Sequence, residues 1–126
     1  MRRRGLHLAV GVALVVTLGS CAQTGSTTSF ELAEFSITGP DQLTADTASV
    51  QASNSGEFAH TLVITDEAGE VAAATDLIQP GETSNLAIEL SAGLYSFTCR
   101  IVIEDGEGRL VDHYQAGMNT TVRVTG

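Results

Sequence analysis

The sequence predicts an all-β protein, with one small antiparallel sandwich behind an N-terminal export segment. Three observations indicate this fold class. From Phe30 onward, apolar residues alternate with polar ones at the period of two that half-buried strands require. Turn-forming groups such as Asn54-Ser55-Gly56 and Pro80-Gly81 separate these alternating runs at short intervals. No internal repeat or second domain is visible, so residues 30–126 are expected to form one domain of common size.

The first twenty residues have the pattern of a signal peptide. Arg2 to Arg4 form a basic segment, and the apolar stretch from Gly5 to Leu18 is too short to span a bilayer comfortably. It ends in Leu18-Gly19-Ser20-Cys21, which resembles the bacterial lipobox. The resemblance implies cleavage before Cys21, acylation of Cys21 with chains such as palmitate, and stable anchoring at the extracytoplasmic face of the cell membrane. An ordinary cleaved signal with a chance cysteine is the alternative.

After the export segment, the chain divides into a tether and a series of strands. Residues 21–29 are mostly small and polar, and they predict a flexible tether. In the first strand, from Phe30, the inward positions change parity at Ala33-Glu34, which predicts a β-bulge in an edge strand. For residues 70–77, the sequence does not decide between a helical turn and an irregular strand. The remaining inward faces are those of Ala48, Val50 and Ala52; His60, Leu62 and Ile64; Leu86, Ile88 and Leu90; Tyr95, Phe97, Cys99 and Ile101; and Val122 with Val124.

The part of the chain beyond residue 20 is strongly acidic. It holds all fifteen Asp and Glu residues, no Lys, and only Arg100, Arg109 and Arg123, which gives a net charge of −12. A surface of this charge repels nucleic acid, so we expect no nucleic-acid partner. It suits a basic partner protein, or it serves solubility alone.

Four side chains that bind metals are each rare beyond residue 20. His60 and His113 are the only histidines there, Met118 is the only methionine, and Cys99 is the only cysteine besides Cys21. Strand parity points Cys99 and His60 into the core near strand ends, while His113 and Met118 follow on the connection to the last strand. The four can therefore converge at one end of the sandwich. A thiolate, two imidazoles and a weak thioether suit copper as Cu(I) and Cu(II), whereas zinc rarely uses a thioether.

At these residues the sequence resembles the cupredoxins, the blue copper proteins. Asn54-Ser55-Gly56 followed by Phe58-Ala59-His60 resembles the family's N-x-G … H strand. The segments Gly93 to Cys99, His113 to Met118 and Val122 to Val124 resemble its ending, G-x-Y-x-F-x-C … H-x-x-x-G-M … V-x-V. The resemblance covers residues 30–126 and implies a cupredoxin-like Greek-key β-sandwich. It also implies one copper ion held by His60, Cys99, His113 and Met118.

Two features depart from the family pattern. Thirteen residues, 100–112, separate Cys99 from His113, where the family usually has only a few. We expect this insertion to form a hairpin beside the metal with the acidic segment 104–108 at its tip, and a disordered insertion is the alternative. Thr61 follows the first histidine in place of a common Asn. We expect Thr61 and Asn54 to support the ligands through hydrogen bonds.

The resemblance implies single-electron transfer. We therefore expect a monomeric electron carrier, not an enzyme, that exchanges electrons with a redox partner bearing a basic docking face. Copper storage or delivery at the cell surface is an alternative that uses the same ligands with an exchangeable metal. A structural sandwich that has lost metal binding is the third possibility. Multicopper oxidases and copper nitrite reductases need further histidine ligands, and residues 21–126 have none to spare.

Overall fold

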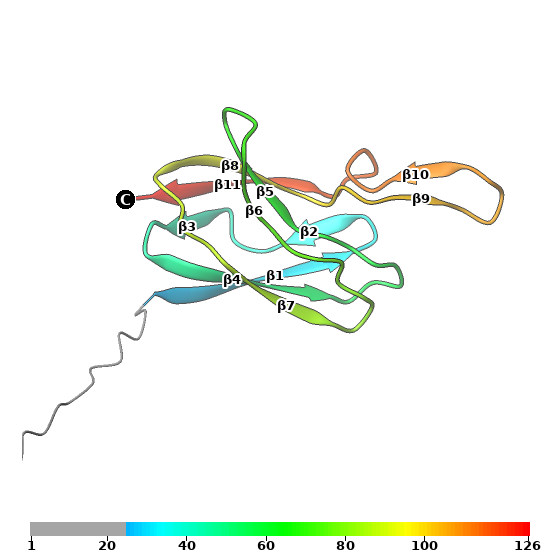
Figure 1. The fold of residues 1–126 in the computed structure, drawn as a ribbon, viewed down its shortest axis with the longest axis horizontal. Helices are drawn as coiled ribbons and strands as arrows, with labels where there is room; N and C mark the ends of the chain where they lie inside the picture. The colour runs from blue at the N-terminus through cyan, green and yellow to red at the C-terminus, as the bar shows by residue number, and fades with distance from the viewer. Residues whose placement is uncertain (1–24) are drawn as a thin grey trace, which may run out of the picture.

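The computed structural model describes residues 25–126, which form two packed sheets and a projecting hairpin (Figure 1). In spatial order, the first sheet contains β2 (Ser36–Thr38), β1 (Ser26–Ala33), β4 (Thr47–Asn54) and β7 (Thr83–Ala87). The second contains β3 (Gln42–Thr44), β11 (Asn119–Thr125), β8 (Gly93–Thr98), β5 (Val63–Asp66) and β6 (Val71–Ala74). The hairpin pairs β9 (Val102–Glu104) with β10 (Leu110–Asp112). Within residues 25–126, no helix has the length and apolar character needed to cross a membrane.

The core lies between the inner faces of the two sheets. Phe30 of β1 and Phe97 of β8 meet there, with ring centroids 4.9 Å apart. Alternating inward residues from both sheets surround this pair and are almost completely buried, as a sandwich requires. The all-β prediction is therefore confirmed. The other core residues are Leu32, Leu43, Val50, Ala52, Leu62, Ile64, Ile78, Leu90, Tyr95, Cys99, Met118, Val122 and Val124.

Both sheets are mixed, and not purely antiparallel as the sequence predicted. β1 runs parallel to β4, and β11 runs parallel to β3. The reason is that the chain changes sheet between these partners, since β3 pairs in the second sheet before β4 returns beside β1. Crossing connections of this kind are typical of Greek-key sandwiches.

Two predictions at the start of the domain are wrong. First, β1 begins at Ser26, and residues 27–29 pair with β4, so this part of the predicted tether is a strand. Its side chains are mostly exposed and polar, which is why no alternation marked it. Second, the expected bulge at Ala33-Glu34 is a hairpin turn at residues 34–35 between β1 and β2, and β1 is an interior strand. The predicted signal peptide, the lipid site Cys21 and residues 22–24 lie outside the described residues.

Two segments for which the sequence left alternatives open form strands. Residues 71–74 form β6, which pairs with β5 and excludes the helical turn. Residues 102–112 form the β9–β10 hairpin, which confirms the expected hairpin and excludes a disordered insertion. Figure 1 shows that this hairpin extends beyond the end of the sandwich.

Candidate metal centre

Three of the four predicted ligands bring their donor atoms together at one end of the sandwich. The candidate ligand atoms of His60, Cys99 and His113 all lie within 4.8 Å of one another. Cys99 Sγ is 3.9 Å from His60 Nδ1 and 3.6 Å from His113 Nδ1, and the two Nδ1 atoms are 3.2 Å apart. All three residues are fully buried. A thiol and two imidazoles therefore converge in a site that excludes water.

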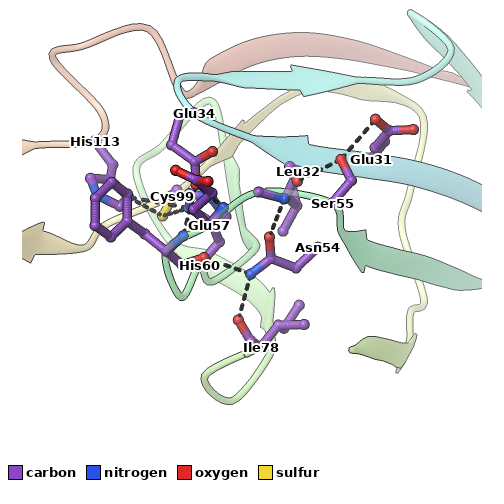
Figure 2. A network of polar contacts seen from close by, with 12 residues as sticks. Glu31, Leu32, Glu34, Asn54, Ser55, Glu57, His60, Ile78, Cys99 and His113 are labelled. Carbon is purple, nitrogen blue, oxygen red and sulfur yellow. Dashed lines mark hydrogen bonds and ion pairs between the residues drawn. The ribbon is translucent and has the colours of Figure 1, made fainter. Parts of the chain in front are cut away.

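The position of His60 is fixed by backbone hydrogen bonds to Ile78 and by bonds that order the adjacent segment. It forms an isolated β-bridge with Ile78, whose N–H and C=O pair with those of His60 at 2.8 and 3.0 Å. The Asn54 side-chain amide donates to the carbonyl oxygens of Phe58 (2.7 Å) and Ile78 (2.9 Å), as Figure 2 shows in part. Asn54 also accepts from the Gly56 N–H at 2.9 Å. The predicted supporting role of Asn54 thus corresponds to bonds that shape the segment leading into His60.

Cys99 follows directly after β8, and its sulfur has hydrogen-bond donors. The backbone N–H of Thr61 points to Sγ at 3.5 Å, and the Thr61 hydroxyl lies 3.9 Å from it. The same hydroxyl oxygen accepts from the Arg100 N–H at 3.4 Å. The structure thus places both donor groups of Thr61 beside the sulfur of Cys99.

His113 and Met118 lie on a compact loop between β10 and β11. The His113 N–H donates to the Ile101 carbonyl at 3.0 Å, which continues the pairing of the β9–β10 hairpin up to the site. The fully buried Met118 donates its N–H to the His113 carbonyl at 2.9 Å and accepts from the Cys99 N–H at 3.0 Å. Three of the predicted ligands are therefore linked through their backbones.

Gly117 is required where this loop meets the β1–β2 turn. Its φ is +126°, a conformation that residues with a Cβ rarely adopt. A Cβ at this position would lie 2.8 Å from the Phe35 carbonyl oxygen. The Phe35 ring meets His113 edge-on, with centroids 5.4 Å apart. The glycine thus allows the turn to pack against the ligand loop.

The two imidazoles are in different electrostatic surroundings. Burial lowers the pKa of His113, and nearby His60 lowers it further, while the Glu34 and Asp112 carboxylates oppose the shift. This favours a neutral ring with a free lone pair. His113 Nε2 is buried without a hydrogen-bond partner. His60 Nε2, in contrast, lies 3.2 Å from Glu34 Oε1.

These observations fit a bound cation. Two ring nitrogens face each other at 3.2 Å beside a sulfur, and a metal ion could accept a lone pair from each of these three atoms. The donor types and the weak thioether next to them are those that suit copper.

Sequence reasoning did not find two residues that surround the site. Glu34 and Phe35 form the β1–β2 turn, and each contacts one histidine. Burial raises the pKa of Glu34, but hydrogen bonds from the N–H groups of Phe58, Glu34 and Glu57 and from His60 outweigh it and hold the pKa below its ordinary value. The only signal in the sequence was the parity break at this point.

The fold is similar to that of several solved structures at low sequence identity. The azurin Az-iso2 from Methylomonas sp. strain J matches with a TM-score of 0.59 and 16% identity, over 80% of this chain and 98% of the azurin. Reduced rusticyanin matches with a TM-score of 0.56 and 18% identity, over 81% of both chains. A purple cupredoxin from Nitrosopumilus maritimus matches with a TM-score of 0.51 and 16% identity, over 78% of this chain and 99% of its own. No protein-family model and no curated protein matches the sequence.

Residues 25–126 therefore have the cupredoxin fold. This confirms the fold class that the sequence resemblance implied. The convergence of His60, Cys99 and His113 is a separate observation, because it comes from the donor atoms of this chain.

Proposed function

We propose that this chain binds one type 1 copper ion through His60, Cys99, His113 and Met118 and carries single electrons. The observation that carries the proposal is the buried convergence of one thiol and two imidazoles in a cupredoxin fold. Copper would supply a reversible Cu(I)/Cu(II) couple. The residues of the chain hold the donors in position through backbone bonds, so little rearrangement is needed when the charge of the ion changes.

The test is a titration of the purified domain, residues 25–126, with Cu(II), followed by visible spectroscopy. These residues contain both sheets, so the domain is expected to fold without the preceding segment. One equivalent of Cu(II) should produce an intense thiolate-to-copper band that disappears on reduction and returns on oxidation. A domain that circular dichroism shows to be folded but that gives no such band would contradict the proposal.

Burial of the ligands favours an electron carrier over a protein that stores or delivers copper. His60, Cys99 and His113 are all fully buried, whereas an exchangeable ion needs an open site. Within residues 25–126, these three form the one group of His, Cys, Asp or Glu residues placed to hold a metal ion. A copper enzyme would need a further metal or substrate site, so we propose a carrier and not an enzyme.

The proposed place of action is the extracytoplasmic side of a membrane, where lipid on Cys21 would tether a monomer. The support is the Leu18-Gly19-Ser20-Cys21 sequence. Fractionation of cells that express the full chain tests it, since Cys21→Ser should release the protein from the membrane fraction. A Ser variant that still sediments with membranes and still incorporates labelled fatty acid would exclude Cys21 as the lipid site.

A further inference from the structure

We propose that Glu34, in the β1–β2 turn, is a positioning residue that holds His60 with its proton on Nε2 and so directs the Nδ1 lone pair at the metal. The part of this inference that concerns copper rests on the proposed function. The part that concerns the imidazole applies to the metal-free protein as well.

Glu34 contacts His60 from the turn between β1 and β2 of the first sheet. Its Oε1 accepts three hydrogen bonds, from the N–H groups of Glu57 (2.8 Å) and Phe58 (2.9 Å) and from His60 Nε2 (3.2 Å). Figure 2 shows the carboxylate above the segment that leads into His60, on the side away from Asn54. The two backbone N–H donors fix the carboxylate, and the carboxylate then fixes the imidazole. A ring nitrogen next to a carboxylate carries the proton, so the other nitrogen is free to bind a metal.

The chain leaves room for this carboxylate at Gly56. A Cβ at position 56 would collide with Glu34 Oε1 and would lie 2.7 Å from Glu34 Cδ. Gly56 therefore allows the side chain of Glu34, which is only 24% exposed, to approach the backbone closely. Because two features of the chain, the turn and the glycine, serve the same contact, the contact is part of how the site is built.

The charge of Glu34 should also affect the metal. A carboxylate bonded to the outer nitrogen of a ligating histidine makes the inner nitrogen a stronger donor. A negative charge one imidazole away also stabilises Cu(II) more than Cu(I), because the interaction scales with the charge of the ion. Glu34 should thus lower the reduction potential of the site.

The first test uses metal-free protein and does not depend on copper. Nitrogen-15 NMR of the histidine side chains should show His60 with a proton on Nε2 that exchanges slowly with water. In Glu34→Ala this proton should exchange at least about tenfold faster, because its acceptor and the bonds that order the segment are lost. Gly56→Ala should act in the same direction by displacing the carboxylate. Unchanged tautomer and exchange rate in both variants would overturn the inference.

The second test measures copper. Glu34→Gln keeps the shape of the side chain and removes its charge, and Glu57→Gln is the matched control, because its exposed side chain lies in the same segment without contacting His60. Glu34→Gln should weaken Cu(II) binding about 10- to 100-fold. Each tenfold loss relative to Cu(I) corresponds to a rise in potential of about 59 mV. Equal potentials in Glu34→Gln and Glu57→Gln would overturn the role of the charge. If the parent binds no copper at all, the proposed function fails, and the NMR result alone decides the role of Glu34.

Discussion

At the scale of single residues, the four proposed ligands should contribute differently to one centre. In the proposed site Cys99 would be the one sulfur that gives a thiolate-to-copper band, so Cys99→Ala should be colourless. Met118→Leu would remove a weak thioether donor, so the variant should keep the band but have a higher reduction potential. The Leu side chain is similar in volume, so the metal-free variant should lose less than about 1.5 kcal/mol of unfolding free energy. Visible spectra, voltammetry and thermal melts measure the three quantities. An unchanged potential in Met118→Leu would exclude the thioether as a ligand.

The sequence pointed to the residues that meet at the candidate metal centre but not to all of those that contact them. Alternation pointed Cys99 and His60 into the core, because each continues the inward face of a strand. Glu34 and Phe35 could not be found in this way. They contact the histidines from a turn that is distant in the sequence, and the alternation within one strand does not show which other segments pack against it.

At the scale of elements, the β9–β10 hairpin carries exposed apolar and acidic residues beside the site. Val102 and Leu110 are 54% and 75% exposed. Glu107 pairs with Arg109 on the surface at 2.9 Å, an interaction of small energy. Replacing Glu104 and Glu107 with Gln should slow electron exchange with a basic redox partner roughly several-fold at low salt, because a few charges that steer the partner are lost. The visible spectrum should not change.

The matched control for this hairpin variant is Glu67→Gln with Glu70→Gln in the turn between β5 and β6, which changes the net charge equally. Stopped-flow rates at several ionic strengths should fall for the hairpin variant only, and the difference should disappear at high salt. Equal rates for both variants would show that the hairpin does not guide a partner.

Asp105 must be treated separately because it builds the tip of the hairpin. Its carboxylate accepts from the N–H of Arg109, from Arg109 Nε and from the N–H of Glu107, at 2.8 to 2.9 Å. These bonds, that of the Arg109 N–H first, lower the pKa of Asp105. A lowered pKa means that the stabilisation is present above the unfolded value of about 3.9 and is lost as the pH falls through the folded value.

The amide shifts of Glu107 and Arg109 should therefore stay constant down to about pH 4 and change below it. Asp105→Asn should show altered shifts at neutral pH and no transition in this window. A parent transition centred at or above the unfolded value would contradict the contacts.

The elements themselves were only partly predictable. The hairpin followed from its Asp- and Gly-rich tip between two apolar runs, a signal that lies within one short segment. The parallel pairs β1–β4 and β3–β11 could not be predicted, because alternation shows that a segment is a strand but not which strand lies beside it. The early start of β1 was missed for a related reason, since residues 26–29 are stabilised by backbone pairing and bury little apolar surface.

At the scale of the whole molecule, copper should stabilise a domain that already folds without it. The core of paired Phe30 and Phe97 lies between the sheets and does not require a metal. A ligand that binds only the folded state adds about 4 kcal/mol when its free concentration is a thousand times its Kd. The melting temperature should rise with copper in the parent and stay constant in Cys99→Ala. Equal melting temperatures of the metal-free and copper-loaded parent would contradict a site formed by the folded state.

The β1–β2 turn connects the candidate metal centre to the first sheet. Glu34 and Phe35 come from the first sheet, whereas Cys99 and Met118 flank strands of the second, so the site joins the two layers. Any slip of one layer over the other would move the histidines relative to the sulfur. The visible spectrum of the copper-loaded protein would then change when the two layers loosen, before the strands themselves separate.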